Sequence, residues 1–279
     1  MFSNPGQSFS AALERETPLQ IVGTLNALSA LIAKEAGFSA LYLSGAGVAN
    51  ACFGLPDIGV TTLDNIVEEA NRITYSVDLP LLVDIDTGWG SYAMIQRSIS
   101  CLERAQCAAV HIEDQILEKR CGHLSGKGIV PIMEMVDRIK ACVDARKNPE
   151  FLIMARTDAF AVEGLEKALQ RAEAYKNAGA DLLFPEALPD IALYQKFKEK
   201  TGLPLLINLT EFGKTPLYSL DEVKEAKIDM ALYPLSAARA MYLSARHVYE
   251  AIRQKGSQNT CLSKMLTRNE LYQLLKYKE

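Results

Sequence analysis

Eight short apolar runs alternate with longer amphipathic segments along the chain, and this alternation constrains the fold more than any other feature. Strands that alternate with helices form parallel sheets buried on both faces, and eight such strands close a barrel. The sequence therefore predicts an α/β fold, a (β/α)8 TIM-type barrel. Strands are expected near 20–23, 39–43, 80–85, 107–112, 151–155, 181–184, 204–208 and 228–233, and helices include 62–76, 91–105, 131–146 and 163–178.

Nothing in the composition divides the chain, so residues 1–279 are predicted to form one domain. A net charge of −4 with no basic block argues against a nucleic-acid partner. No apolar run approaches the roughly 18 residues of a membrane span, and residues 1–20 lack the apolar segment of a signal peptide. The six cysteines form no C-x-x-C pair, which is typical of reduced thiols. We expect a cytoplasmic protein that acts on a small molecule.

Polar residues follow almost every predicted strand. In a TIM barrel the active site lies at the C-terminal ends of the strands, where these residues meet. A single polar ending would be explained as a helix cap or a turn, but six or seven of them predict an active site. The endings are Ser44-Gly45-Ala46, Asp84-Ile85-Asp86, Glu113-Asp114, Arg156-Thr157-Asp158, Pro185-Glu186, Asn208-Leu209-Thr210-Glu211 and Pro234-Leu235-Ser236.

Asp84 and Asp86 form a D-x-D motif at the end of the third predicted strand. Alternation along a strand puts residues i and i+2 on one side, so both carboxylates can face one cation. Hard oxygen ligands favour Mg²⁺ over zinc. The other interpretation is a turn in which Asp86 caps the next helix. Glu113 either holds a metal-bound water or forms an ion pair.

The segment Lys119-Arg120-Cys121-Gly122-His123 places a thiol beside two cations and a histidine. Such neighbours tune the pKa of a thiol away from about 8.5, which suits a proton-transfer group. The other interpretation is a surface loop with an idle cysteine. Gly126, Lys127 and Gly128 follow, and their composition is typical of a mobile loop.

Three arginines are candidates for binding carboxylates, because a guanidinium group matches a carboxylate with two parallel hydrogen bonds. Arg156 directly follows an apolar run, Arg239 lies one turn into the last predicted barrel helix, and Arg268 lies in a charged C-terminal stretch. Taken alone, Arg268 fits a solvated surface residue. His111 and His247 are interpreted as structural.

Motifs are spread along the chain: LYLSGAGVAN, GLPDIGV, VDIDTGWG, HIEDQ, KRCGH, IMARTDAFAVEGL, FPEAL, INLTEFG and TRNELY. Together they resemble the 2-methylisocitrate lyases of the isocitrate lyase and phosphoenolpyruvate mutase superfamily, over residues 5 to 275. Isocitrate lyases proper are much longer and usually read KKCGH, and the phosphonate-forming mutases lack the cysteine motif. The resemblance implies a barrel whose C-terminal helix is exchanged between the subunits of a homotetramer.

The resemblance also implies an activity, the Mg²⁺-assisted, retro-Claisen-type cleavage of 2-methylisocitrate to pyruvate and succinate in the methylcitrate cycle of propionate catabolism. Asp84 and Asp86 would hold the metal, and Cys121 would protonate the succinate carbanion. His123 would shape the surroundings of that thiol. The base is either Tyr42 or Asp57. The implied substrate contacts are Ser44, Gly45, Ala46, Cys121, Gly122, Arg156, Glu186, Asn208, Leu209, Thr210, Arg239 and Arg268.

Two alternatives stay open at this point. The first is a related lyase or hydrolase that acts on 2,3-dimethylmalate, oxaloacetate or isocitrate. The second is a barrel that binds carboxylates without converting them, because a fold by itself does not define an activity. The combination of the D-x-D and KRCGH motifs argues against the second.

Overall fold

The computed structural model describes residues 4–118, 122–123 and 126–277. Its centre is a sheet of eight parallel strands in the order β6-β5-β4-β3-β2-β1-β8-β7. A bridge between Leu183 and Leu205 joins the two ends of the sheet and closes the barrel. The predicted (β/α)8 fold is thus confirmed. The strands are β1 (Leu19–Gly23), β2 (Ala40–Leu43), β3 (Leu81–Asp84), β4 (Ala109–Glu113), β5 (Leu152–Thr157), β6 (Leu182–Pro185), β7 (Leu206–Asn208) and β8 (Met230–Tyr233).

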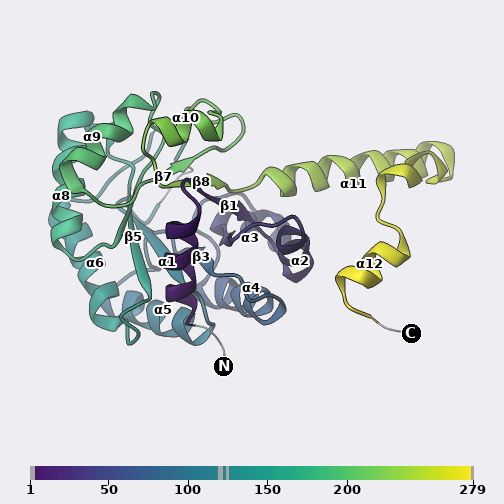
Figure 1. Ribbon diagram of the computed structural model, residues 1–279, viewed down its shortest axis with the longest axis horizontal. Coiled ribbons are helices and arrows are strands. Elements are labelled where there is room, and N and C mark those ends of the chain that lie inside the picture. The colour runs from purple at the N-terminus through teal and green to yellow at the C-terminus, as the bar shows by residue number, and fades with distance from the viewer. Residues whose placement is uncertain (1–3, 119–121, 124–125, 278–279) are drawn as a thin grey trace.

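Helices surround the barrel and follow the strands in turn (Figure 1). The helix expected over 163–178 starts later, because Gly164 has a φ of +81° and separates α7 from α8. The helices are α1 (Pro5–Arg15), α2 (Ala27–Glu35), α3 (Gly45–Phe53), α4 (Leu63–Ser76), α5 (Tyr92–Arg104), α6 (Ile132–Ala145), α7 (Phe160–Glu163), α8 (Leu165–Asn177), α9 (Ala192–Thr201), α10 (Leu220–Glu225), α11 (Ser236–Lys255), the 3₁₀ helix η1 (Asn259–Lys264) and α12 (Arg268–Leu274).

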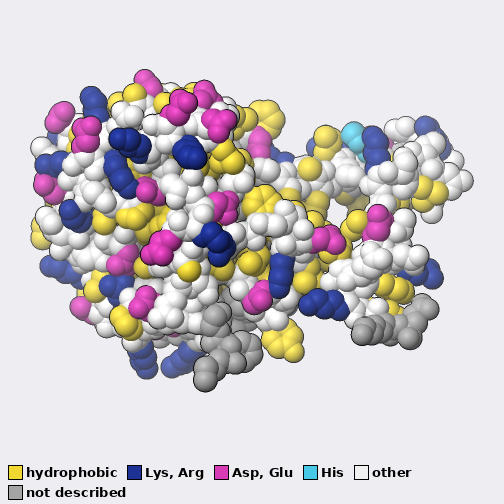
Figure 2. Space-filling view, viewed as in Figure 1, with side chains coloured by type: hydrophobic (Ala, Val, Ile, Leu, Met, Phe, Trp, Pro, Cys, Tyr) yellow, Lys and Arg dark blue, Asp and Glu magenta, His cyan; other side chains and the backbone are white. Residues whose placement is uncertain are grey.

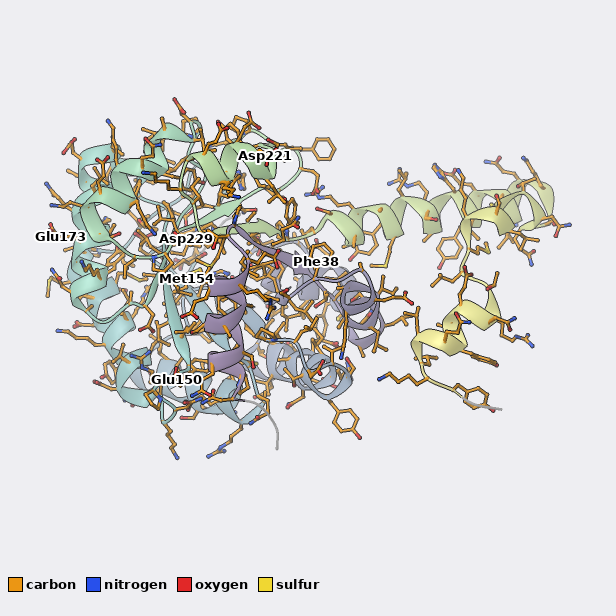
Figure 3. The ribbon with its side chains drawn as sticks, in the orientation of Figure 1. Phe38, Glu150, Met154, Glu173, Asp221 and Asp229 are labelled. Carbon is orange, nitrogen blue, oxygen red and sulfur yellow. The ribbon has the colours of Figure 1, made fainter. Side chains whose placement is uncertain are left out.

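The apolar core has two parts. The larger part lies between the strands and the surrounding helices, as expected for strands buried on both faces. The smaller part fills the barrel interior, where Phe9 and Ala12 of α1 pack with residues such as Leu19 and Met154. Figure 3 shows Met154 beside α1. Helix α1 therefore closes the end of the barrel opposite the C-terminal ends of the strands.

Helix α11 leaves the barrel after β8 and projects away from it, so that η1 and α12 lie outside the barrel (Figure 1). Ala238 is its one buried residue, whereas Met241, Tyr242 and Leu243 are exposed. Figure 2 shows hydrophobic side chains along this projecting arm. Within the described parts of the chain, no helix combines the length and apolar character needed to cross a membrane.

Candidate active site at the barrel mouth

Asp84 and Asp86 converge on one small space at the C-terminal ends of the strands. Both side chains are buried, with 5% and 6% of their residue surface exposed. Gly45 N donates to Asp84 Oδ2 at 3.1 Å. A Cβ atom on Gly45 would lie 3.2 Å from Asp84 Oδ2 and 3.5 Å from Asp86 Oδ1. The two carboxylates thus meet beside Gly45. Strand alternation is not the cause, because β3 ends at Asp84 and Asp86 has a left-handed φ of +48°.

The segment Ser44-Gly45-Ala46 forms the start of α3 rather than an extended strand end. Ser44 is the N-cap residue, and its Oγ accepts a hydrogen bond from Gly47 N at 3.2 Å. Ser44 and Gly45 are buried and Ala46 is half-buried. The free N–H groups of a helix N-terminus favour an anion. The N–H groups of Gly45 and Gly47 already donate to Asp84 and Ser44, so this segment acts on an anion mainly through the positive end of the helix dipole.

Tyr42 and His111 lie next to Asp84 inside the barrel. Tyr42 Oη is 2.9 Å from His111 Nε2 and 3.4 Å from Asp84 Oδ2, and the two rings are stacked. Burial, and next the carboxylate of Asp84, raise the pKa of Tyr42 well above its usual value. Asp57 lies half-buried in the loop between α3 and α4. The interpretation of His111 as a core residue missed that its Nε2 is 3.5 Å from Asp84 Oδ1.

Arg156 ends up among three carboxylates at the C-terminal end of β5. Its Nε donates to Asp158 Oδ2 at 3.0 Å and lies 3.2 Å from Glu113 Oε2, and its Nη2 is 3.9 Å from Glu186 Oε1. Burial by itself would lower the pKa of Arg156, but these carboxylates outweigh it and raise that pKa well above its usual value. Arg156 is therefore a permanent buried cation. Of the two interpretations of Glu113, the ion pair is present.

Glu186 links residues from three elements. Its Oε1 accepts from His123 Nε2 at 3.0 Å, and Asn208 Nδ2 lies 3.4 Å from both carboxylate oxygens. Burial would raise the pKa of Glu186, but the charge of Arg156 and the His123 hydrogen bond lower it. Lys214 N donates to His123 Nδ1 at 2.9 Å, so the proton of a neutral His123 is on Nε2. Glu186 is thus held as a carboxylate.

Gly122 lies directly against the site. A Cβ atom there would lie 2.4 Å from Glu186 Oε1 and 2.5 Å from Arg156 Nη2, so no other side chain fits without movement. Lys119, Arg120 and Cys121 lie outside the described residues. The side chain of Lys127 is buried and paired with Asp158, and the mobility expected of this loop stays a prediction.

The remaining predicted contacts separate into two groups. Leu209 and Thr210 are buried at the end of β7, and Arg239 lies in the first turn of α11 with Nε 3.5 Å from Glu211 Oε2. Arg268 is exposed at the start of α12, on the projecting arm. The structure of one chain therefore does not bring Arg268 to the mouth that holds the other residues, since α11 carries it away.

The barrel fold and the buried polar residues at the C-terminal ends of its strands together define an enzyme of the (β/α)8-barrel class. A family model described as phosphoenolpyruvate phosphomutase matches residues 9–253, and the chain belongs to this family. The chain is 54% identical to 2-methylisocitrate lyase of Escherichia coli (strain K12) over 275 residues, 98% of this chain and 93% of that protein.

Two solved structures extend the comparison. A crystal structure of 2,3-dimethylmalate lyase matches with a TM-score of 0.91 at 34% identity, over 98% of this chain and 92% of that one. Phosphonopyruvate hydrolase in complex with oxalate and Mg²⁺ matches with a TM-score of 0.86 at 26% identity, over 98% of this chain and 95% of that one. The match over 98% of this chain in both cases shows that its fold is shared with enzymes named for small carboxylate compounds.

Proposed function

We propose that this chain, over residues 1–279 as one lyase domain, cleaves 2-methylisocitrate into pyruvate and succinate. The observation that carries the proposal is the barrel mouth, where two buried carboxylates converge near a permanently charged arginine. The similarity to the Escherichia coli enzyme of that name supports the choice of substrate. The free cysteines among the described residues fit a reducing compartment, and we propose the cytoplasm.

Asp84 and Asp86 fit a Mg²⁺ ion. Both are oxygen ligands, both are buried, and the space between them is small enough for a Cβ on Gly45 to approach both. Mg²⁺ usually keeps several water and substrate oxygens as ligands, so two protein carboxylates are sufficient to hold it. When bound there, the ion would act as a Lewis acid on the substrate hydroxyl and its neighbouring carboxylate.

The residues of the mouth supply the other functions. Arg156 binds a substrate carboxylate, and the positive end of the α3 helix dipole favours binding of another. Either Asp57 takes the proton of the substrate hydroxyl, or Tyr42 does so as it passes its own proton to His111 Nε2. The carbon–carbon bond then breaks, and the new carbonyl belongs to pyruvate. The electron pair stays on succinate, where Arg156 and Asn208 stabilise its charge. The thiol of Cys121 protonates that carbon, and the proton taken from the hydroxyl restores the thiol.

We further propose that the chain forms a homotetramer in which neighbouring subunits exchange α11. The apolar side chains of Met241, Tyr242 and Leu243 are exposed on this helix and need a cover. Such an exchange would place Arg268 at the mouth of a neighbouring subunit. This reconciles its expected substrate contact with its position on the arm.

A second candidate function is cleavage of 2,3-dimethylmalate, favoured by the TM-score of 0.91 against the lyase of that name. Pyruvate release from 2-methylisocitrate and from 2,3-dimethylmalate is measured beside glyoxylate release from isocitrate and acetate release from oxaloacetate, which tests both. We expect the highest kcat/KM with 2-methylisocitrate. Faster turnover of another acid would replace the substrate, and no turnover of any acid would leave a carboxylate-binding barrel.

A further inference from the structure

Lys127 is a buried cation with two partners. It lies between β4 and α6, and its side chain is 1% exposed. Its Nζ donates to Gly122 O at 2.6 Å and to Asp158 Oδ1 at 2.6 Å. A lysine is rarely buried, because desolvating its charge is unfavourable unless close partners compensate. One ammonium group therefore joins the backbone of the KRCGH motif to a carboxylate of the barrel.

Asp158, the barrel residue that Lys127 binds, is held in place by further hydrogen bonds. Asp158 also accepts a hydrogen bond from Arg156 Nε at 3.0 Å, and its own N–H donates to Asp114 Oδ1 at 2.8 Å. Asp114 is fully buried and accepts from Thr157 Oγ1 at 2.7 Å and Tyr175 Oη at 2.8 Å. Because every member is buried and hydrogen-bonded, Asp158 offers Lys127 a fixed point next to Arg156.

Gly122, the loop residue that Lys127 binds, contacts the active site directly. Gly122 lies so close to Glu186 and Arg156 that it has no room for a Cβ atom. The next residue, His123, is held by Glu186 Oε1 and by the N–H of Lys214. Residues 122–123 thus touch the mouth on one side, while Lys127 holds the Gly122 carbonyl.

We propose that Lys127 is a positioning residue, whose ammonium group fixes the backbone at Gly122 relative to Arg156 by joining the Gly122 carbonyl to Asp158. It acts through these two residues and needs no contact with substrate. Cys121 precedes Gly122 in the chain, so the position of Gly122 sets where the proposed proton donor is attached. The inference rests on the proposed function for the reaction that it serves, but its structural half can be tested without any reaction.

Lys127→Met removes the ammonium group and keeps most of the side-chain volume. We expect kcat to fall on the order of 10²-fold, as for a displacement of about 1 Å at a reacting group. KM should stay within about threefold, because the change weakens interactions made in the transition state of the chemical step and leaves substrate binding unaffected. Lys127→Arg should recover most of the loss. Lys140→Met, an exposed lysine on α6, is the matched control and should leave kcat unchanged.

Hydrogen exchange of the Lys214 amide gives a readout that does not depend on activity. This N–H donates to His123 Nδ1, so its exchange reports whether His123 stays in place. In Lys127→Met we expect exchange to be about tenfold faster, with unchanged exchange in the barrel strands. If the Met variant does not fold, Lys127→Gln takes its place in both measurements.

Two outcomes would overturn the inference. A folded variant with kcat near that of the unchanged protein shows that Lys127 does not position the site. A lower Tm with unchanged kcat and unchanged Lys214 exchange shows a purely structural ion pair. If the unchanged protein releases no pyruvate, the proposed function fails, and exchange alone decides on Lys127: faster exchange supports its positioning role and equal exchange overturns it.

Discussion

Gly122→Ala is the smallest change that tests the arrangement of the mouth. The added Cβ would lie 2.4 Å from Glu186 Oε1 and 2.5 Å from Arg156 Nη2, about 1 Å closer than ordinary contact. Neither partner is free to withdraw, because Glu186 is bound to His123 and Arg156 to Asp158. The backbone at residue 122 must therefore move outward by a distance that matters for catalysis.

From this displacement we expect kcat/KM for pyruvate release to fall about 10²-fold. The stability loss should be moderate, about 1–3 kcal/mol, as is usual when a methyl group is forced into a packed site. Steady-state kinetics and urea unfolding measure the two effects on the same preparations.

Gly202→Ala is the matched control. Gly202 has a left-handed φ of +68° at the end of α9, and no atom lies within 4 Å of its Cβ position. It should lose about 1 kcal/mol of stability through backbone strain and keep its kinetics. If Gly122→Ala kept kcat/KM within threefold of the unchanged protein, the backbone at residue 122 could not lie on Glu186 and Arg156 during turnover.

The remaining predictions concern the metal, the thiol, acid stability and assembly. Asp84→Asn should abolish turnover, and exhaustive chelation of the unchanged protein should do the same until Mg²⁺ is restored; activity in verified absence of metal would contradict both. Cys121→Ser should fold and bind products but lose roughly 10²-fold or more in turnover, because a hydroxyl is a far poorer acid. Burial opposes ionisation of Asp158, but Arg156 and Lys127 lower its pKa to about 2, below the roughly 3.9 of an unfolded aspartate. Its contribution to stability should thus be complete above pH 4 and disappear as the pH falls toward 2, and Asp158→Asn should flatten that part of a thermal-unfolding profile. Light scattering should give a tetramer, and removal of the chain after residue 235 should give smaller species.

The barrel could be predicted because the sequence patterns of its strands and helices each lie within a short stretch of the chain. Each predicted strand overlaps an observed one, and the helices expected over 62–76, 91–105 and 131–146 agree with α4, α5 and α6 within a residue or two at each end. Buried parallel strands are continuous apolar runs, and helices carry a 3.6-residue stripe, so both can be recognised without knowing what they contact.

The site was predictable only in part, because its geometry depends on residues far apart in sequence. Lys127 was assigned to a mobile loop from its glycine neighbours, yet its partner Asp158 lies 31 residues away. His111 was assigned to the core, which is correct for its burial but not sufficient, since its ring reaches Tyr42 and Asp84. Strand alternation could not reveal the left-handed backbone at Asp86.

The joint between β6 and β7 has a consequence for the site. These strands are connected by the bridge of Leu183 and Leu205, whereas the other neighbours pair through continuous ladders. Glu186 follows β6 and Asn208 ends β7, so the two side chains face each other across this joint at 3.4 Å. The barrel should open locally along this line before it opens elsewhere. A carboxylate ligand that binds both Asn208 and the Arg156–Glu186 pair would therefore hold β6 and β7 together at this joint. Hydrogen exchange in β7 should then be slower with the ligand than without it.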